Sequence, residues 1–415
     1  MSATHSSSAA VAEHTVGTAL RSPRLLMRET LAGVVTALAL IPEVISFSVI
    51  AGVDPKVSLI ASVVLCLAMS FLGGRPAMVT AAAGSVALVI GPMVHQHGVQ
   101  YILPAVVLAG LIQILFGVAG MARLMRFIPT AVMTGFVNAL GILIFFAQVA
   151  HFWTKSPLIW GLFILTLLIV LWVPRFIKSI PSPLIAIILL TVFTATSGQL
   201  LPTVGDEGPM SGGLPGLTTL LVPLNGQTLA IIWPCALSIA FVGLMESLLT
   251  ARLVDDLTAT PSNKNRESTG LGIANILAGF YGGIAGCAMI GQTIVNVEMG
   301  KGRSRLSTFA AGLVLLLLVT ALSDMMAKIP MSVLAGIMVI VAVKTFSWHS
   351  VQPSTLKKMP IAETLVMLIT VAATVSTGNL AIGVAAGVSA MLVLPRIVRR
   401  KRAVTSETAS PDPEK

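Results

Sequence analysis

The sequence has few charged residues and few cysteines. Asp, Glu, Lys and Arg make up 10% of its 415 residues, whereas soluble domains carry roughly 25%. A soluble globular enzyme and a disordered chain are therefore both excluded. Cys66, Cys235 and Cys287 lie singly in apolar stretches, which excludes a disulfide-stapled secreted fold. The hydrophobic fraction of 55% and the mean hydropathy of +0.94 indicate an integral membrane protein.

Motifs for catalysis and for ATP-driven pumping are also missing. The sequence contains no Gly-rich phosphate loop with Lys, no Ser/His/Asp grouping and no nucleotide-binding motif. His95 and His97 fall in a predicted loop without a set of metal-ligating partners. We therefore expect neither an enzyme nor a cofactor, and no metal beyond Na⁺ as a coupling ion.

Apolar stretches predict an all-α polytopic membrane protein with about fourteen transmembrane segments. A full crossing takes about 20 apolar residues, and broken helices take fewer. The predicted spans are 30–51, 56–73, 82–95, 101–119, 130–150, 157–173, 181–198, 228–252, 268–282, 288–299, 305–323, 331–346, 361–377 and 379–396.

The basic residues predict the orientation of these spans, because Lys and Arg collect in short cytoplasmic loops. With the N-terminus inside, Lys56, Lys155 and Lys328 fall outside, and the other 23 of the 26 Lys and Arg residues fall inside. The net charge of +10 is thus an orientation signal. The bilayer is the expected partner, nucleic acid is not, and both termini are expected in the cytoplasm.

Two short motifs recur in the same order in both halves of the chain. Phe71–Gly74 returns as Phe280–Gly283, and Ile128–Gly135 returns as Ile329–Gly336. Gly and Pro can recur by chance in apolar chains, but order and spacing together favour a duplication. Each half holds seven spans, an odd number, so the second copy must be inverted relative to the first, as in many secondary transporters.

The third span of each half is predicted to be a half-helix. Span 3 follows Gly73–Pro76 and contains the small-residue run Thr80–Ser85, while span 10 follows Gly282–Gly286 and contains Cys287–Thr293. Short, Gly/Pro-interrupted segments at matching positions indicate helices that begin inside the membrane. Small residues also permit tight helix packing, and the matching break in the other half favours the half-helix interpretation.

Two half-helix N-termini that face each other would form an anion site. Their free N–H groups and positive dipole ends attract negative charge, and small residues let an ion approach the backbone. The candidate substrate-binding residues are Glu43, Phe47, Ala82, Ala83, Gly84, Ser85, Ala288, Met289, Ile290 and Gln292.

Glu246 is the main candidate for ion coupling, because an acid inside the bilayer is costly and is a functional candidate by default. Thr250 lies one turn later on the same helix face. The pair could hold Na⁺ through oxygen ligands, or Glu246 could carry H⁺; a structural hydrogen bond is the simpler alternative. The candidate coupling residues are Glu246, Thr250 and Gly286.

Other acidic residues carry weaker signals. Glu43 occupies the matching first span, but the adjacent Pro42 and Ser46 could make it part of a helix bend. The segment 255–267 contains Asp255, Lys264 and Glu267, and it is expected to form a solvated face of a cytoplasmic loop.

Several motifs together resemble the SulP family of inorganic anion transporters, bacterial relatives of the animal sulfate and anion exchangers. They are Leu31–Gly33, Ile41–Glu43, Glu246–Thr250, Asn275–Gly283 and Gly286–Asn296. The resemblance covers residues 28–397. It implies a seven-plus-seven inverted repeat and an anion site between the N-termini of spans 3 and 10, in a protein of the bacterial inner membrane.

The resemblance also implies a core domain that moves against a gate domain. The core comprises 29–125 (spans 1–4) and 228–325 (spans 8–11), and the gate comprises 126–198 (spans 5–7) and 326–397 (spans 12–14). The remaining segments are a disordered cytoplasmic tail and pre-helix at 1–28, an extracytoplasmic loop at 199–227 and a cytoplasmic tail at 398–415.

The chain departs from the family pattern at three points. Bicarbonate carriers of the family have Asp where this chain has Glu246, which leaves Na⁺ and H⁺ open and favours H⁺ slightly. The animal branch has Arg where this chain has Gln292. Most members also carry a C-terminal STAS domain, which this chain lacks, so regulation and dimerisation through that domain are not expected to carry over. The expected partner is a second copy, in a homodimer through the membrane domain.

These observations predict a secondary active transporter of a small inorganic oxyanion, sulfate or bicarbonate, coupled to H⁺ or Na⁺ by alternating access. One alternative is a nucleobase permease of the uracil or xanthine type with the same fold, for which Glu246 and Gln292 are the obvious ring-binding groups. Another alternative is an anion channel.

Overall fold

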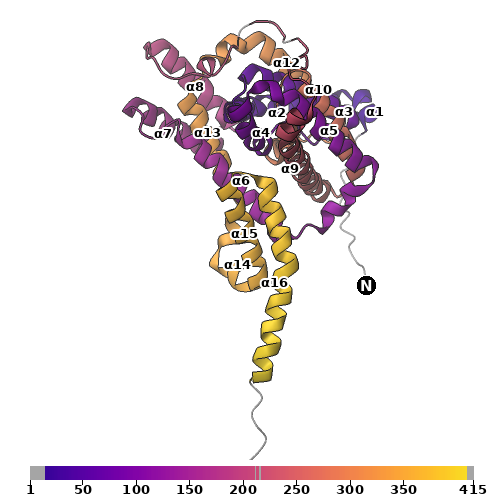
Figure 1. Ribbon diagram of the computed structural model, residues 1–415. Helices are drawn as coiled ribbons and strands as arrows, with labels where there is room; N and C mark the ends of the chain where they lie inside the picture. Colours follow the sequence, from indigo (N-terminus) through magenta and orange to yellow (C-terminus); the bar gives the residue numbers. More distant parts are fainter. Residues whose placement is uncertain (1–14, 211, 215, 409–415) are drawn as a thin grey trace, which may run out of the picture. The chain divides into compact units, whose positions relative to one another are not determined.

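The computed structural model describes residues 15–210, 212–214 and 216–408, and it is 77% helical (Figure 1). The described chain folds as two compact units. Unit 1 comprises the residues up to 125 together with 149–338, and unit 2 comprises 126–148 and the residues from 339 onward. The predicted core and gate domains are defined by which segments move together during transport, whereas the two units are defined by compactness. The division into core and gate stays a prediction.

Unit 1 holds most of the helices and a pair of short strands. In chain order its elements are α1 (Val16–Arg21), α2 (Pro23–Ala51), α3 (Pro55–Leu72), β1 (Thr80–Ala82), α4 (Gly84–His97), η1 (Val99–Tyr101), α5 (Ile102–Val118), α7 (Pro157–Trp172), η3 (Val173–Arg175), α8 (Ser182–Ser197), η4 (Val204–Asp206), α9 (Gly226–Thr258), α10 (Lys264–Gly279), β2 (Gly286–Ala288), α11 (Ile290–Ile294), the π-helical turn η5 (Val295–Met299) and α12 (Arg305–Met326).

Unit 2 contains α6, η6 and three further helices. These elements are α6 (Thr130–Val149), η6 (Trp348–Val351), α14 (Pro353–Lys358), α15 (Ile361–Thr377) and α16 (Leu380–Thr408). The division between the units falls within η2 (Met121–Phe127) and α13 (Met331–Thr345).

Seven helices among the described residues are long and apolar enough to cross a membrane. They are Pro23–Ala51, Pro55–Leu72, Val99–Val118, Thr130–Val149, Pro157–Arg175, Gly226–Thr258 and Arg305–Met326. Four shorter apolar helices are Ser182–Ser197, Met331–Thr345, Ile361–Thr377 and Leu380–Leu394. A helix overlaps each of the fourteen predicted spans, but the exact number of crossings stays a prediction.

Some element boundaries differ from those predicted, because capping residues extend the helices. Helix α2 begins at Pro23, where Ser22 accepts a hydrogen bond from the Leu25 N–H and proline suits the first helical position. The predicted tails extend beyond the described residues, which begin at 15 and end at 408. The β1–β2 pair is an addition to the predicted all-α fold.

Small residues bring α5 and α10 unusually close together. A Cβ atom placed on Gly272 would lie 2.4 Å from the carbonyl oxygen of Gly110, and a Cβ on Gly110 would lie 2.6 Å from the carbonyl oxygen of Gly272. Backbone carbonyls cannot move aside as a flexible side chain can. The two glycines therefore set the distance of this contact, which is typical of small-residue packing between membrane helices.

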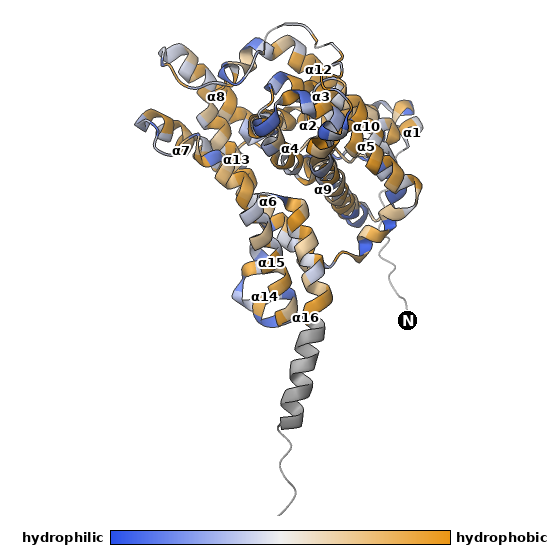
Figure 2. Cartoon of the chain, in the orientation of Figure 1, coloured by the Kyte–Doolittle hydropathy of each residue, from blue (hydrophilic) through white to orange (hydrophobic). Residues whose placement is uncertain are grey.

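The outer helices of unit 1 expose apolar side chains. Ile164, Leu168 and Leu171 on α7, and Ile188 and Val192 on α8, are all exposed. Figure 2 shows apolar colouring along most of both helices. Exposed apolar side chains in such number are costly in water and suit contact with lipid, in agreement with the membrane class predicted from composition.

We expect Gly272→Ala to destabilise the protein by roughly 1–3 kcal/mol, the usual cost of overpacking a tight interface. The new methyl group would force α10 away from α5. Thermal unfolding of the purified protein in detergent measures the effect. Gly161→Ala on α7 is the matched control, because a Cβ there meets nothing within 4 Å; equal melting temperatures for the two variants would contradict the interpretation.

Candidate functional site

Two three-residue strands form the centre of the candidate site. β1 and β2 pair antiparallel, with Ala81 opposite Cys287 and Ala82 opposite Gly286. After β1 the chain stays extended through Ala83 and then begins α4, which packs against both α2 and α9 (Figure 1). After β2 the chain passes through Met289 into α11. Two helices thus begin directly after the two paired strands.

Helix α3 satisfies the outer edge of β1. The Ala82 N–H donates to the Ser62 hydroxyl at 3.1 Å, and the Cys66 thiol donates to the Thr80 carbonyl at 3.2 Å. Ser62 and Cys66 are one turn apart on α3, so they face the same side. Buried backbone groups need such partners, because an unpaired N–H or C=O away from water costs as much as a lost hydrogen bond.

Helices α9 and α10 satisfy the outer edge of β2. The Asn275 side chain accepts from the Gly286 N–H at 2.8 Å and donates to the Gly286 carbonyl at 3.2 Å. Two residues along the strand, the Ala288 N–H donates to Ser247 at 2.9 Å, and the Ala288 carbonyl accepts from Thr250 at 3.3 Å. The short ladder is thereby held on both edges by side chains from three helices.

Glu246 lies where α9 meets both strand-to-helix segments. Its carboxylate oxygen Oε2 accepts a hydrogen bond from the Ser85 hydroxyl in the first turn of α4. The same oxygen accepts from the Cys287 thiol of β2 at 3.2 Å. All three residues are buried. A change of charge on this carboxylate would therefore act directly on both α4 and β2.

The other two predicted coupling residues take part in hydrogen bonds around the ladder. The Thr250 hydroxyl donates to the main-chain carbonyls of Glu246, at 2.8 Å, and of Ala288. Gly286 is held by Asn275, as described above. The described residues contain no group of three or more His, Cys, Asp or Glu side chains suited to a metal ion.

The predicted substrate-binding residues occupy the segments around the ladder. Ala82, Ala83 and Ala288 are fully buried, and Met289 is nearly so; its N–H donates to the Val79 carbonyl. Ile290, the first residue of α11, is half-buried.

Three further predicted residues lie on α2 and α11. The ring of Phe47 lies against Gly84, where a Cβ would come within 2.6 Å of it. The side-chain amide nitrogen of Gln292 donates weakly to the Ala39 carbonyl of α2 at 3.5 Å. The side-chain amide oxygen of Gln292, Oε1, is buried without a partner among the described residues. Glu43 is half-buried on α2.

Sequence reasoning missed Ser62, Ser247, Asn275 and Cys287 as parts of the site. Each is a polar or thiol side chain inside an apolar stretch, and each hydrogen-bonds to the ladder or to Glu246. Asn275 stands in a motif noted above, and a buried Asn in a membrane span is itself a signal. The serines carry no comparable signal, because Ser is common in tightly packed membrane helices.

The comparisons with known proteins assign the family. A model described as the sulfate permease family matches residues 26–157 and 151–370. The chain belongs to this family. The resemblance expected from its motifs is therefore confirmed.

Relatives and solved structures agree with this assignment. The putative sulfate transporter YbaR of Bacillus subtilis is 48% identical over 378 residues, which cover 91% of this chain and 78% of the relative. The bicarbonate transporter BicA of Picosynechococcus is 27% identical over 77% of this chain and 63% of its own length. The transmembrane domain of a cyanobacterium BicA matches with a TM-score of 0.78 at 26% identity, over 86% of this chain and 97% of that domain. This likeness confirms a multi-pass helical membrane fold.

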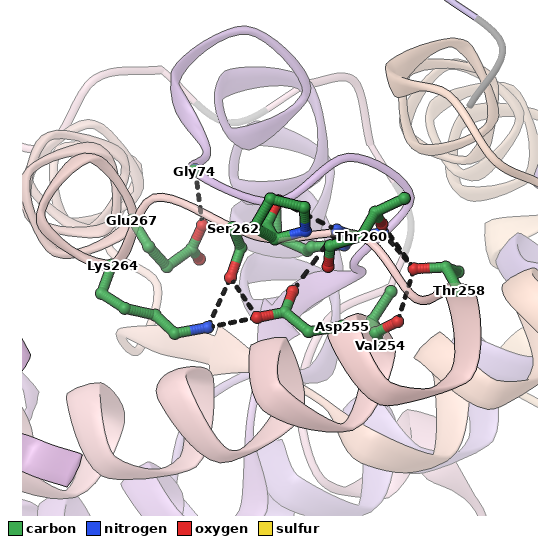
Figure 3. Close-up of polar contacts among 10 residues, drawn as sticks. Gly74, Val254, Asp255, Thr258, Thr260, Ser262, Lys264 and Glu267 are labelled. Atoms are coloured by element: carbon green, nitrogen blue, oxygen red, sulfur yellow. Dashed lines mark hydrogen bonds and ion pairs between the residues drawn. The ribbon is translucent and has the colours of Figure 1, made fainter. Parts of the chain in front are cut away.

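In this member of the sulfate permease family, a second polar cluster joins α9, α10 and the segment after α3 (Figure 3). Asp255 pairs with Arg75 at 3.3 Å and with Lys264 at 2.6 Å. Arg75 also donates to the Thr258 hydroxyl at 2.7 Å, and Ser262 donates to Asp255 at 2.8 Å. The cluster fixes the connection between α9 and α10 against the start of the segment that leads to β1.

The expectation that 255–267 forms a solvated face is wrong for its last residue. Glu267 is fully buried, and its Oε2 accepts from the Gly74 N–H at 2.7 Å (Figure 3). Glu267 precedes the predicted ninth span, which begins at 268. Burial raises the pKa of this carboxyl to about 7, although the backbone N–H groups of Gly74 and Arg75 and the nearby charges of Arg305 and Lys264 oppose the shift.

We expect Glu267→Gln to change how stability depends on pH. The native pKa of Glu267 lies above its value of 4.5 in the unfolded chain, so the native state binds more protons between these values and loses stability as pH rises toward 7. Gln cannot titrate, but it can still accept from Gly74. The variant should thus be more stable than the parent above pH 7, by up to roughly 3 kcal/mol.

Melting temperatures in detergent from pH 4 to 8.5 test this expectation. Glu207→Gln, at an exposed acid in a loop, is the matched control and should keep the parent's pH dependence. An unchanged pH profile for Glu267→Gln would show that the carboxyl is not titrating in this range.

Proposed function

We propose that the chain is a secondary active transporter that carries a small inorganic oxyanion, sulfate or bicarbonate, across the bacterial cytoplasmic membrane. The relatives support this substrate class, since one is named a putative sulfate transporter and another a bicarbonate transporter. The asymmetry of Lys and Arg supports cytoplasmic termini. Such a protein acts by transport and not by catalysis.

The observation that carries the proposal is the start of α4 at Gly84, directly after a buried strand. Its N-cap residue, Ala83, supplies no side-chain hydrogen bond to the first turn. The first N–H groups of α4 and the positive end of its dipole are therefore available to a negative ligand. Ala82, Ala83 and Gly84 add almost no bulk, so an anion can approach these amides closely.

We propose that α4 and α11 are the half-helices of spans 3 and 10, with the substrate held between their N-termini. Met289, the N-cap of α11, likewise gives no side-chain cap. The Ser85 hydroxyl and the Gln292 amide are neutral polar groups at the two helix starts, and the Phe47 ring supplies an apolar wall beside Gly84. Neutral donors together with two dipole ends suit a small oxyanion.

We propose H⁺ as the coupling ion, carried by Glu246. Its carboxylate accepts hydrogen bonds from Ser85, which belongs to the proposed substrate site, and from Cys287, which directly precedes Ala288 of that site. Protonation of Glu246 would remove the negative charge beside the anion and would rearrange both donors. Occupancy by an anion and protonation would thus favour each other, which is the condition for symport.

The motion that carries the site across the membrane would follow the predicted division into core and gate. The ladder, Glu246, α3 and the part of α2 from residue 29 onward fall in the predicted core segments 29–125 and 228–325. We propose that this part moves as one body against the gate, with a homodimer formed through the membrane domain.

We expect Glu246→Gln to abolish accumulation driven by a pH gradient while the protein stays folded, because Gln accepts hydrogen bonds but carries no proton. Uptake of labelled sulfate and bicarbonate into proteoliposomes, under imposed pH or sodium gradients, measures this. The matched control is Glu207→Gln, which removes an exposed acid and should leave uptake at the parent's rate. Full accumulation by Glu246→Gln would remove Glu246 from the coupling role.

The same assay separates the alternatives. Uptake of labelled uracil in place of either anion would support a nucleobase permease. Anion flux that ignores pH and sodium gradients and exceeds carrier rates would support a channel. Accumulation driven by a sodium gradient alone would show that the coupling ion is Na⁺, bound at Glu246 and Thr250, and not H⁺.

We expect Gly84→Val to weaken anion binding by about tenfold or more, equivalent to about 1.4 kcal/mol. The added side chain would collide with the Phe47 ring and crowd the first amides of α4. The KM for uptake and the affinity measured by calorimetry both report the loss. Gly161→Val, on the open surface of α7, should leave both values unchanged, and an unchanged affinity in Gly84→Val would place the site elsewhere.

A further inference from the structure

A cavity separate from the ladder opens where α3 ends. Its volume is about 300 Å³, and it is bounded by α1, α3, α10 and α12. Its lining includes Ser70, Phe71, Arg266, Arg305 and Phe309. None of them is among the candidate residues for anion transport.

Two arginines form the polar side of this cavity. Arg266 donates to the Phe71 carbonyl at 2.9 Å and to the Leu72 carbonyl at 3.3 Å. Arg305 donates to the Gly73 carbonyl at 2.7 Å and to the Ser70 carbonyl at 3.3 Å. These carbonyls belong to the free C-terminal end of α3, which attracts cations. Both guanidinium groups are thereby held at the same helix end.

The two guanidinium groups retain unused hydrogen-bonding capacity. Each carries five N–H donors, and the hydrogen bonds above use two on each side chain. Among the described residues, no carboxylate forms an ion pair with either arginine. Glu267 interacts electrostatically with Arg305, but its carboxylate is fully buried and accepts a hydrogen bond from Gly74. The cavity therefore has an excess of positive charge.

The remaining wall of the cavity is apolar and is formed by Val16, Phe71, Leu306 and Phe309. Phe71 is 66% exposed, and its ring meets that of Phe309 edge to face, with centroids 5.7 Å apart. A free inorganic anion would gain nothing from this wall. A ligand with a phosphate group and an attached hydrocarbon chain would use both the guanidinium groups and the rings.

We propose that this cavity binds the headgroup of an anionic phospholipid, with its phosphate on Arg266 and Arg305 and the start of an acyl chain along Phe71 and Phe309. Arginine pairs suit the several oxygens of a phosphodiester. The lipid would sit against the last turn of α3, just before the segment that leads to β1.

Native mass spectrometry of the full-length protein in detergent tests the proposal, with phosphatidylglycerol as the probe and phosphatidylcholine as the neutral comparison. The parent should retain phosphatidylglycerol in preference to phosphatidylcholine. Arg266→Gln should weaken its binding about fivefold, since one basic residue contributes on the order of 1 kcal/mol to binding an anionic lipid. Arg123→Gln, at an exposed basic residue outside the cavity, is the matched control and should leave binding unchanged.

Phe309→Glu keeps both arginine side chains and places a carboxylate inside the cavity, where it would compete with the phosphate for the guanidinium groups. It should abolish retention of phosphatidylglycerol even if loss of an arginine proves to unfold the protein. Equal retention of both lipids, or full retention by Phe309→Glu, would overturn the proposal. Displacement of the lipid by millimolar inorganic phosphate would also overturn it, because the ligand would then be a free anion.

Discussion

The structure depends on satisfying the hydrogen bonds of two non-helical segments buried among apolar helices. Inside a membrane protein, a backbone N–H or C=O without a partner costs several kcal/mol, so irregular backbone survives only where the protein itself supplies donors and acceptors. β1 and β2 satisfy each other on their inner edges. Their outer edges depend on Ser62, Asn275 and Ser247. The places where α4 and α11 begin follow from this arrangement.

The same hydrogen bonds connect the scaffold to the proposed chemistry. Thr250 holds the Ala288 carbonyl and lies one turn from Glu246, whose carboxylate accepts from Ser85 and Cys287. The helix that bears the acid is therefore fixed to both strand-to-helix segments. A proton on Glu246 and a ligand at the start of α4 would share the Ser85 hydroxyl, so neither can change without affecting the other. Protonation of Glu246 and anion binding can then be coupled through this one hydroxyl, without a long pathway through the protein.

The membrane class and the family were predictable from the sequence, because hydropathy and short motifs can be recognised without knowledge of side-chain directions. The breaks before spans 3 and 10 were visible as runs of small residues. Their pairing as β1 and β2 was not, because three-residue strands have no periodic pattern and their partners lie about 200 residues apart. Glu267 looked like one of several charges in a solvated loop, and only the fold shows that the Gly74 N–H points at its carboxylate. A sequence records which residues are polar, but tertiary contacts between distant segments set the partner of each one.

Helix α3 links the two polar regions of unit 1. In its middle, Ser62 and Cys66 hold the edge of β1, and at its end Arg266 and Arg305 hold its last carbonyls. The segment between α3 and β1 is therefore fixed at both ends, with Glu267 bonded to it between them. Since α4 follows β1 directly, the position of its N-terminus depends on this fixed segment. A ligand or charge that moves the end of α3 would therefore also move the N-terminus of α4, where the anion is proposed to bind.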